Sequence, residues 1–145
     1  MDVAVLEELV RDLVGTAGLL IVVGSNDAVG EMRVGATVQV TFKDGWANIE
    51  AEGWHIHLNM EAVEAARFVE AEDHGGNIPE VYYVLFSDAQ GKALVRFYFP
   101  NPWLDSDEKP TQFQPEKLRL FEGFRDRYAG RGGVVFSKES RRGSH

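Results

Sequence analysis

The strongest constraint on the fold is a strict alternation of apolar and polar residues between positions 36 and 43. The apolar members of this segment are Ala36, Val38, Val40 and Phe42. A period of two is typical of a strand in an antiparallel sheet, with one face buried and the other in water. Asp44-Gly45 follows at once and is a hairpin turn signal. The next segments, Trp46–Glu50 and Trp54–Leu58, are therefore expected to be short strands of the same sheet.

Two amphipathic segments at the ends of the chain are predicted to be helices. The first has an apolar stripe at helical spacing, made of Leu6, Leu9, Val10, Leu13 and Val14. Asp2 suits its N-cap and Gly15 its end. The second covers Pro115–Tyr128, because Pro115 suits a first turn and Gly130 follows the last.

Further short apolar segments between these helices are expected to be strands. They are Leu19–Val23, Val29–Val34, Arg67–Ala71, Val81–Phe86 and Ala93–Phe99, with one helical turn in residues 60–66. Val81–Phe86 is apolar at every position, which predicts a strand covered on both faces. The sum is an α+β fold: a meandering antiparallel sheet of about seven to eight strands, with an N-terminal and a C-terminal helix packed on it. We expect one domain over residues 1–136 and a flexible tail over residues 137–145.

Charge and composition exclude several classes of protein. Among 145 residues, 15 Lys and Arg oppose 23 Asp and Glu, a net charge of −8, which gives nucleic-acid phosphates and anionic membranes no general attraction. The chain has no cysteine, which excludes disulfide scaffolds, thiolate nucleophiles and Cys-ligated metal centres. The longest apolar run, Leu19–Val23, is far too short to span a membrane. No basic segment opens the chain as in a signal peptide, so a cytoplasmic location is expected.

His55 and His57 are the residues that point most directly to chemistry. They stand two apart in an expected strand, so their side chains should share a face. Two imidazoles on one face can hold a metal ion, and imidazole is also a common axial ligand of haem iron. The alternative is that both are polar residues on a solvated strand face. No pattern in the chain predicts a catalytic nucleophile or a phosphate-binding loop.

One short motif suggests a metal-dependent enzyme. His55-x-His57-x-x-x-Glu61 resembles the first motif of the cupins, in which two histidines and a glutamate bind iron, manganese or zinc. The glycines that frame the cupin motif are absent here. A third histidine, His74, could complete such a site from a loop.

A longer resemblance is to the haem-utilisation carrier family typified by ChuX and HutX. Trp46-Ala47-Asn48-Ile49 resembles the aromatic-x-Asn-Leu strand of that family, and His57-Leu58-Asn59 resembles its His-Ile-Arg segment. Further similar segments are Phe68-Val69-Glu70, Tyr82–Gly91, Val95-Arg96-Phe97-Tyr98 and Gln114–Phe121. The resemblance implies a twisted antiparallel sheet with flanking helices, assembly into a homodimer, and haem binding in the cytoplasm.

The resemblance also implies a haem site. The binding histidine of the family matches His57, which would be the axial iron ligand, with His55 or His74 as its partner. A second family histidine falls near Val23–Ser25, where this chain has none, and Asp73-His74-Gly75 replaces a Phe-Met-Gly loop.

The rest of the expected site follows from side-chain chemistry. The porphyrin wall would be built from aromatic side chains: Trp54, Trp46, Phe97 and Phe99. Arg96 and Arg67 would meet the propionates, which suit guanidinium groups. Two other interpretations stay open: the same fold without haem, acting as a dimeric interaction or regulatory module, and a cupin-like enzyme.

Overall fold

A computed structural model describes residues 1–24, 27–73 and 78–139. This part of the chain contains two α-helices, nine strands and one short 3-10 helix. The helices are α1 (Val3–Val14), α2 (Pro115–Tyr128) and the 3-10 turn η1 (Met60–Ala62). The strands are β1 (Leu20–Gly24), β2 (Val29–Arg33), β3 (Gln39–Lys43), β4 (Trp46–Ala51), β5 (Trp54–Asn59), β6 (Ala65–Glu72), β7 (Glu80–Ser87), β8 (Ala93–Tyr98) and β9 (Val134–Glu139).

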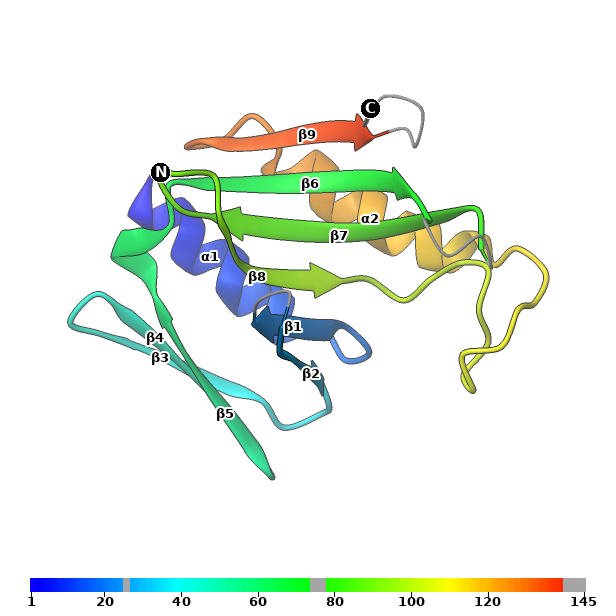
Figure 1. The fold of residues 1–145 in the computed structure, drawn as a ribbon, viewed down its shortest axis with the longest axis horizontal. Helices are drawn as coiled ribbons and strands as arrows, with labels where there is room; N and C mark the ends of the chain where they lie inside the picture. The colour runs from blue at the N-terminus through cyan, green and yellow to red at the C-terminus, as the bar shows by residue number, and fades with distance from the viewer. Residues whose placement is uncertain (25–26, 74–77, 140–145) are drawn as a thin grey trace.

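The strands form two sheets (Figure 1). Six of them pair in the order β2-β1-β8-β7-β6-β9, and the other three in the order β3-β4-β5. Every pairing is antiparallel except that of β6 with β9, which is parallel. The α+β class and the two flanking helices are confirmed. The single meander is divided into two sheets, and the described strands number nine rather than seven or eight.

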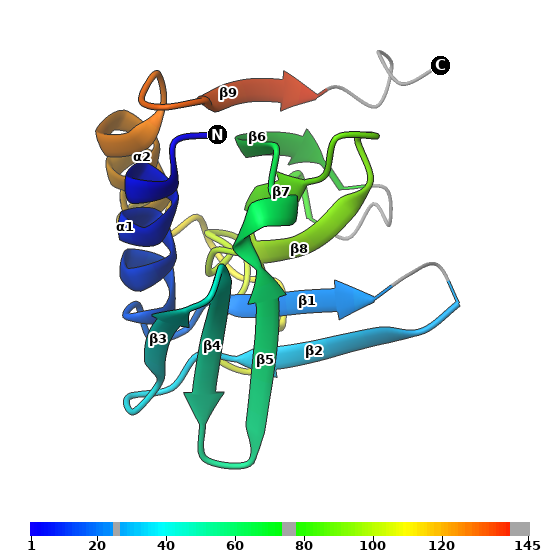
Figure 2. The same ribbon diagram turned by 90° about the vertical axis from the view of Figure 1, so that its left-hand side faces the viewer.

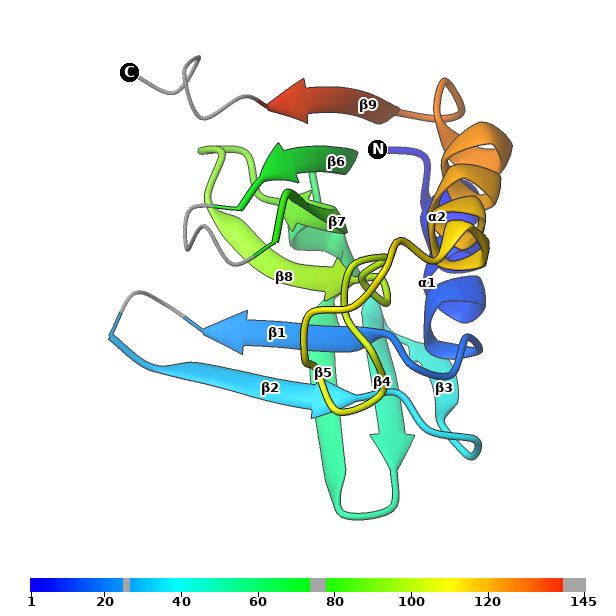
Figure 3. The ribbon, with the colours of Figure 1, turned by 90° about the vertical axis from the view of Figure 1, so that its right-hand side faces the viewer.

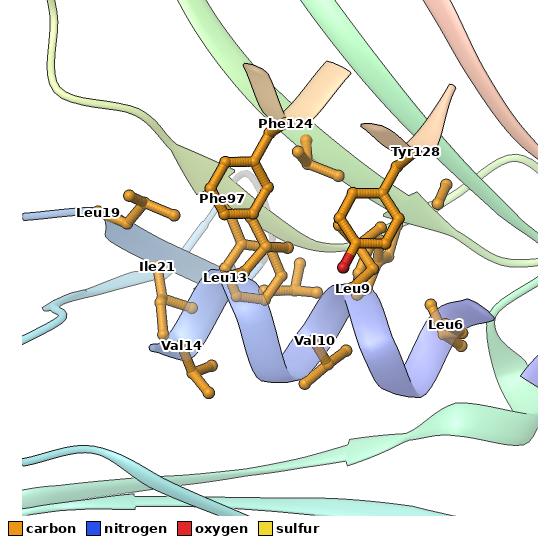
Figure 4. Packing of buried hydrophobic residues seen from close by; sticks show 14 of the residues in the cluster. Leu6, Leu9, Val10, Leu13, Val14, Leu19, Ile21, Phe97, Phe124 and Tyr128 are labelled. Carbon is orange, nitrogen blue, oxygen red and sulfur yellow. The ribbon is translucent and has the colours of Figure 1, made fainter. Parts of the chain in front are cut away.

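Both helices pack on the same face of the six-stranded sheet, and the small sheet lies at one end of the molecule beside α1 (Figures 2 and 3). The predicted stripe of α1 is buried in the core: Leu6, Leu9, Val10, Leu13 and Val14. Leu9 and Leu13 point toward Phe97 of the six-stranded sheet and toward the α2 rings, whereas Val10 and Val14 point away from them (Figure 4). The helix begins after Asp2, whose side chain accepts a hydrogen bond from the Val5 N–H at 3.2 Å. The N-cap and the bounds of both helices agree with the prediction.

An aromatic cluster joins α2 to the sheet. The Phe121 ring lies 5.3 Å from that of Tyr82, 5.3 Å from that of Phe99 and 5.9 Å from that of Phe68, measured between centroids. Phe121 itself is completely buried. This side chain is therefore the centre of the contact between the second helix and strands β6 and β7.

Polar contacts join α1 and α2 beside this aromatic cluster. The Tyr128 hydroxyl of α2 donates a hydrogen bond to the Asp12 carboxylate of α1. Just beyond α2, Arg131 pairs with Glu8 of α1 at 2.9 Å. Burial, together with the hydrogen bond to Asp12, raises the pKa of Tyr128 above its usual range, so this hydroxyl remains a donor at neutral pH.

Strand β9 corrects the expected domain boundary. It extends to Glu139 and pairs with β6, so residues 137–139 belong to the sheet and not to a tail. Two ion pairs link these strands: Lys138 to Glu70 at 3.6 Å and Arg67 to Glu139 at 3.9 Å. Residues 140–145, which include His145, lie outside the described part of the chain.

Strand β7 is covered on one face only. Tyr82, Val84 and Phe86 are buried against the helices, whereas Val81 and Leu85 on the other face are half-buried. The sequence predicts cover on both faces of β7. Within a single chain, the helices cover only the face that carries Tyr82, Val84 and Phe86. No helix among the described residues is long and apolar enough to cross a lipid bilayer.

Candidate functional site

The histidine pair lies on the outward face of the small sheet. In the β4–β5 register His57 is opposite Asn48 and His55 is opposite Glu50. Both imidazoles are exposed, and their ring centroids are 5.2 Å apart. The shared face predicted from the spacing of two is confirmed. The inward face of the same sheet, with Ile49 and Leu58, is part of the core.

His57 has a defined side-chain partner. Its Nδ1 lies 2.7 Å from Oδ1 of Asn48 on the neighbouring strand. Asn48 is half-buried on β4, the central strand of the small sheet, while His57 is exposed on β5 at the edge. This contact engages one ring nitrogen and leaves Nε2 as the nitrogen that can bind a metal.

The histidine pair lines an open hollow of about 450 Å³. The other lining residues come from the β4–β5 hairpin: Glu50, Ala51, Gly53 and Trp54. Trp54 is half-buried and also packs against the core. The structure therefore brings His57 and His55 together on one face, whereas Trp54 borders the same hollow from a position that alternates to the inward face.

Within one chain, the two predicted arginines do not lie with the histidines. Arg96 is on β8 of the six-stranded sheet and lines a different hollow of about 420 Å³, with Val22 and Lys92. Arg67 is on β6, where it pairs with Glu139. Both arginines therefore lie on a different sheet from β5. No local sequence pattern predicts which sheet a strand joins.

The expected aromatic wall is also divided. Trp46 does lie on the outward face of the small sheet, 43% exposed, in the row next to Asn48 and His57. Phe97 and Phe99 are buried in the core of the other sheet, with 0% and 5% of their surface exposed. Alternation turns these rings toward the helices, so they cannot contact a ligand on β5.

The cupin-type arrangement is not formed by the described residues. Glu61 lies on η1, and its carboxylate packs beside Gly45 at the β3–β4 turn. Within residues 1–24, 27–73 and 78–139, no three His, Cys, Asp or Glu side chains gather closely enough to hold a metal ion. His74 lies outside the described residues.

Asn48 is the site residue that sequence reasoning missed. The signal for it was present, because Glu52-Gly53 is a hairpin turn that pairs Ala51 with Trp54 and thereby fixes the register. Counting back along both strands from that turn places Asn48 opposite His57. The same count places Glu50 opposite His55.

The outward face of the six-stranded sheet forms a second surface. The rings of Tyr83 and Tyr98 lie side by side there, tilted by 38°, with centroids 4.9 Å apart. Burial raises the pKa of both tyrosines, and the Arg96 guanidinium opposes that rise. Val29 and Val135 add exposed apolar surface, at 60% and 46%. No described helix covers this face (Figure 2).

Comparison with solved structures identifies the fold. A protein of Agrobacterium tumefaciens is similar over 89% of this chain and 70% of its own, with a TM-score of 0.69 and 22% identity. The heme binding protein ChuX is similar over 88% of this chain and 74% of its own, with a TM-score of 0.66 and 14% identity. The heme-binding protein PhuS from Pseudomonas aeruginosa matches 83% of this chain with 33% of its own length, at a TM-score of 0.58 and 15% identity. No curated protein matches the chain in sequence.

A protein-family model matches residues 7–129, which include most of α1, all of α2 and eight of the nine described strands. This match covers the small sheet with its histidine pair as well as the large sheet. Because this match accounts for the strands that carry the histidine pair, the cupin interpretation has no structural support. The chain is a divergent member of the ChuX-like haem-utilisation family.

Proposed function

We propose that the protein binds haem through His57 and acts as an intracellular haem carrier. The observation that carries this proposal is the exposed His57 imidazole, whose Nδ1 is held by Asn48 so that Nε2 is available. The relatives ChuX and PhuS are heme-binding proteins, and this supports the same ligand class here. The proposed role is in the cytoplasm, where the sequence leads us to expect the chain.

The residues on this face fit haem iron better than a bare metal ion. A single imidazole is sufficient to hold haem iron, because the porphyrin supplies the other nitrogen ligands. A bare metal ion needs about three or four protein ligands, and the described residues gather no such set here. Haem bound at this site would supply iron chemistry, while the protein positions the imidazole and offers Trp46, which shares the outward face, as a cover for the porphyrin.

The two histidines are suited to alternative ligation of one iron. Both project from the same face of β5, with ring centroids 5.2 Å apart. Both imidazoles would therefore face a haem on this surface from the same side, and either of them would hold its iron. His57 is the proposed ligand, and His55 is the substitute when His57 is missing.

Titration of the purified protein with hemin tests this function. We expect a Soret band shift that saturates at a fixed ratio of hemin to protein, since a defined ligand nitrogen gives a defined number of sites. A spectrum that drifts without saturation indicates adsorption of hemin to apolar surface. That result would favour the alternative, a ChuX-like fold that acts as an interaction or regulatory module without haem.

We also propose that two chains pair through the outward face of the six-stranded sheet. This face carries the half-buried side chains Val81, Tyr83 and Leu85 on β7 and the exposed side chains Val29 and Val135, and neighbouring exposed apolar side chains mark interaction surfaces. Light scattering at micromolar concentration should give about twice the 16.2 kDa mass of the chain. Leu85→Lys should shift the mass toward the monomer, whereas Gln39→Lys on the small sheet should not. A monomer mass for the unmodified protein would contradict the proposal.

A further inference from the structure

We propose that Asn48 is the positioning residue of the haem site: it fixes the tautomer of His57 and thereby selects Nε2 as the iron-binding nitrogen. The role of Asn48 in iron binding rests on the proposed function, whereas the tautomer of His57 rests on the geometry alone. The role and the tautomer can be tested separately, because the tautomer exists in the protein without haem.

The chemistry of the contact determines which nitrogen carries the proton. A carboxamide oxygen has lone pairs and no hydrogen, so Asn48 Oδ1 can only accept a hydrogen bond. The ring nitrogen 2.7 Å from it, Nδ1 of His57, must therefore donate. A neutral imidazole has one N–H, so Nε2 is left with the lone pair that coordinates iron.

The position of Asn48 makes it a firm anchor. It stands on β4, the central strand of the small sheet, between Thr41 of β3 and His57 of β5. Its chain neighbours Ala47 and Ile49 are 0% and 1% exposed, so the backbone that carries Asn48 is held by the core. An exposed imidazole on an edge strand has no such support of its own. The hydrogen bond to Asn48 therefore restrains the orientation of the His57 ring, because the backbone of Asn48 is itself held by the core.

The expected size of the effect follows from other metal sites. Removing the group that holds a ligating histidine usually weakens metal binding by roughly 10- to 100-fold, because the ring loses both its tautomer and its orientation. Asn48→Leu removes the acceptor while keeping a side chain of similar size. Asn48→Asp keeps an acceptor oxygen at the same place and should restore the tautomer.

The test is proton–nitrogen correlation spectroscopy of the protein without haem at about pH 8.5, where free imidazole is neutral. The His57 signals are assigned by their loss in His57→Ala. In the unmodified protein and in Asn48→Asp, we expect protonated Nδ1 and unprotonated Nε2. In Asn48→Leu, the ring should revert mainly to the Nε2–H form that free histidine prefers. Thr41→Val, in the same cross-strand row, is the matched control and should leave the spectrum unchanged.

Two results would overturn the inference. One is an Nε2–H signal from His57 in the unmodified protein, which would mean that Asn48 presents its NH2 group to the ring. The other is an unchanged tautomer in a folded Asn48→Leu variant, with folding checked by circular dichroism.

Hemin titration of the same variants separates this inference from the proposed function. Asn48→Leu should bind hemin roughly tenfold or more weakly than the unmodified protein, and Thr41→Val should bind it equally. If the tautomer changes as expected but no variant binds hemin, the haem function fails and the role of Asn48 stands. If hemin binds through His57 while the tautomer is reversed, the role of Asn48 fails alone.

Discussion

The double variant His55→Ala, His57→Ala should lose the spectrum of histidine-ligated haem and keep only weak association with hemin. The physical reason is that iron coordination needs a nitrogen lone pair, whereas burial of the porphyrin is hydrophobic and non-directional. After both imidazoles are removed from the face of β5, no other described residue that lines the hollow carries an imidazole. The measurement is the Soret band and its saturation during hemin titration.

The single variants show which histidine is the ligand. His57→Ala should change the spectrum strongly, because its Nε2 is the nitrogen that the Asn48 contact leaves free. His55→Ala should retain most of the spectrum. In His57→Ala, His55 is close enough to provide partial coordination, which makes the double variant the cleaner experiment. Gln39→Ala, on the same outward face and opposite Glu50, is the control and should bind hemin normally.

The double variant should remain folded. Both side chains are exposed, and exposed substitutions usually change the unfolding free energy by about 0.5 kcal/mol or less. Its thermal midpoint should therefore stay within a few degrees of that of the unmodified protein. Unchanged hemin affinity and spectrum in the folded double variant would refute His57 and His55 as ligands. His74 would then be the next candidate.

Local sequence patterns were sufficient to predict most of the elements. The apolar stripe and the caps of α1 are properties of one continuous segment, and so are Pro115 and the end of α2 at Tyr128. The β3–β4 hairpin is equally local, because Asp44-Gly45 adopts the positive φ angles that a two-residue turn requires. Each of these features depends on neighbours in the chain, so each can be predicted without the tertiary structure.

The division into two sheets and the strand β9 could not be predicted in this way. Strand β9 pairs in parallel with β6, whose sequence is more than 60 positions away, and cross-strand pairs such as Lys138 with Glu70 hold it there. No periodicity in residues 134–139 indicates such a partner.

The candidate site is likewise predictable only where it depends on neighbours in the chain. The spacing of two along β5 is sufficient to predict that His55 and His57 share a face, whereas the separation of Arg96 and Arg67 from them depends on which sheet each strand joins.

Loss of the Phe121 ring should cause the largest change in stability. Phe121→Ala should lower the unfolding free energy by about 3–5 kcal/mol, since it deletes a fully buried ring and leaves a cavity. The ring also contacts three others, those of Phe68, Tyr82 and Phe99, and such pairs add to the cost. Domains are stable by roughly 5–15 kcal/mol in total, so this one substitution removes a large share. Urea unfolding with linear extrapolation measures it.

A matched control distinguishes core packing from a general effect of losing a phenylalanine. Phe113 is 39% exposed and contacts the Trp103 ring on the loop before α2, so Phe113→Ala should cost much less than Phe121→Ala. Phe121→Leu refills part of the cavity and should recover part of the loss. It should also bind hemin normally, because Phe121 packs on the six-stranded sheet and the proposed ligand lies on the small one. A loss below about 1 kcal/mol for Phe121→Ala, the typical effect of any substitution, would mean that this ring is not the centre of the helix–sheet contact.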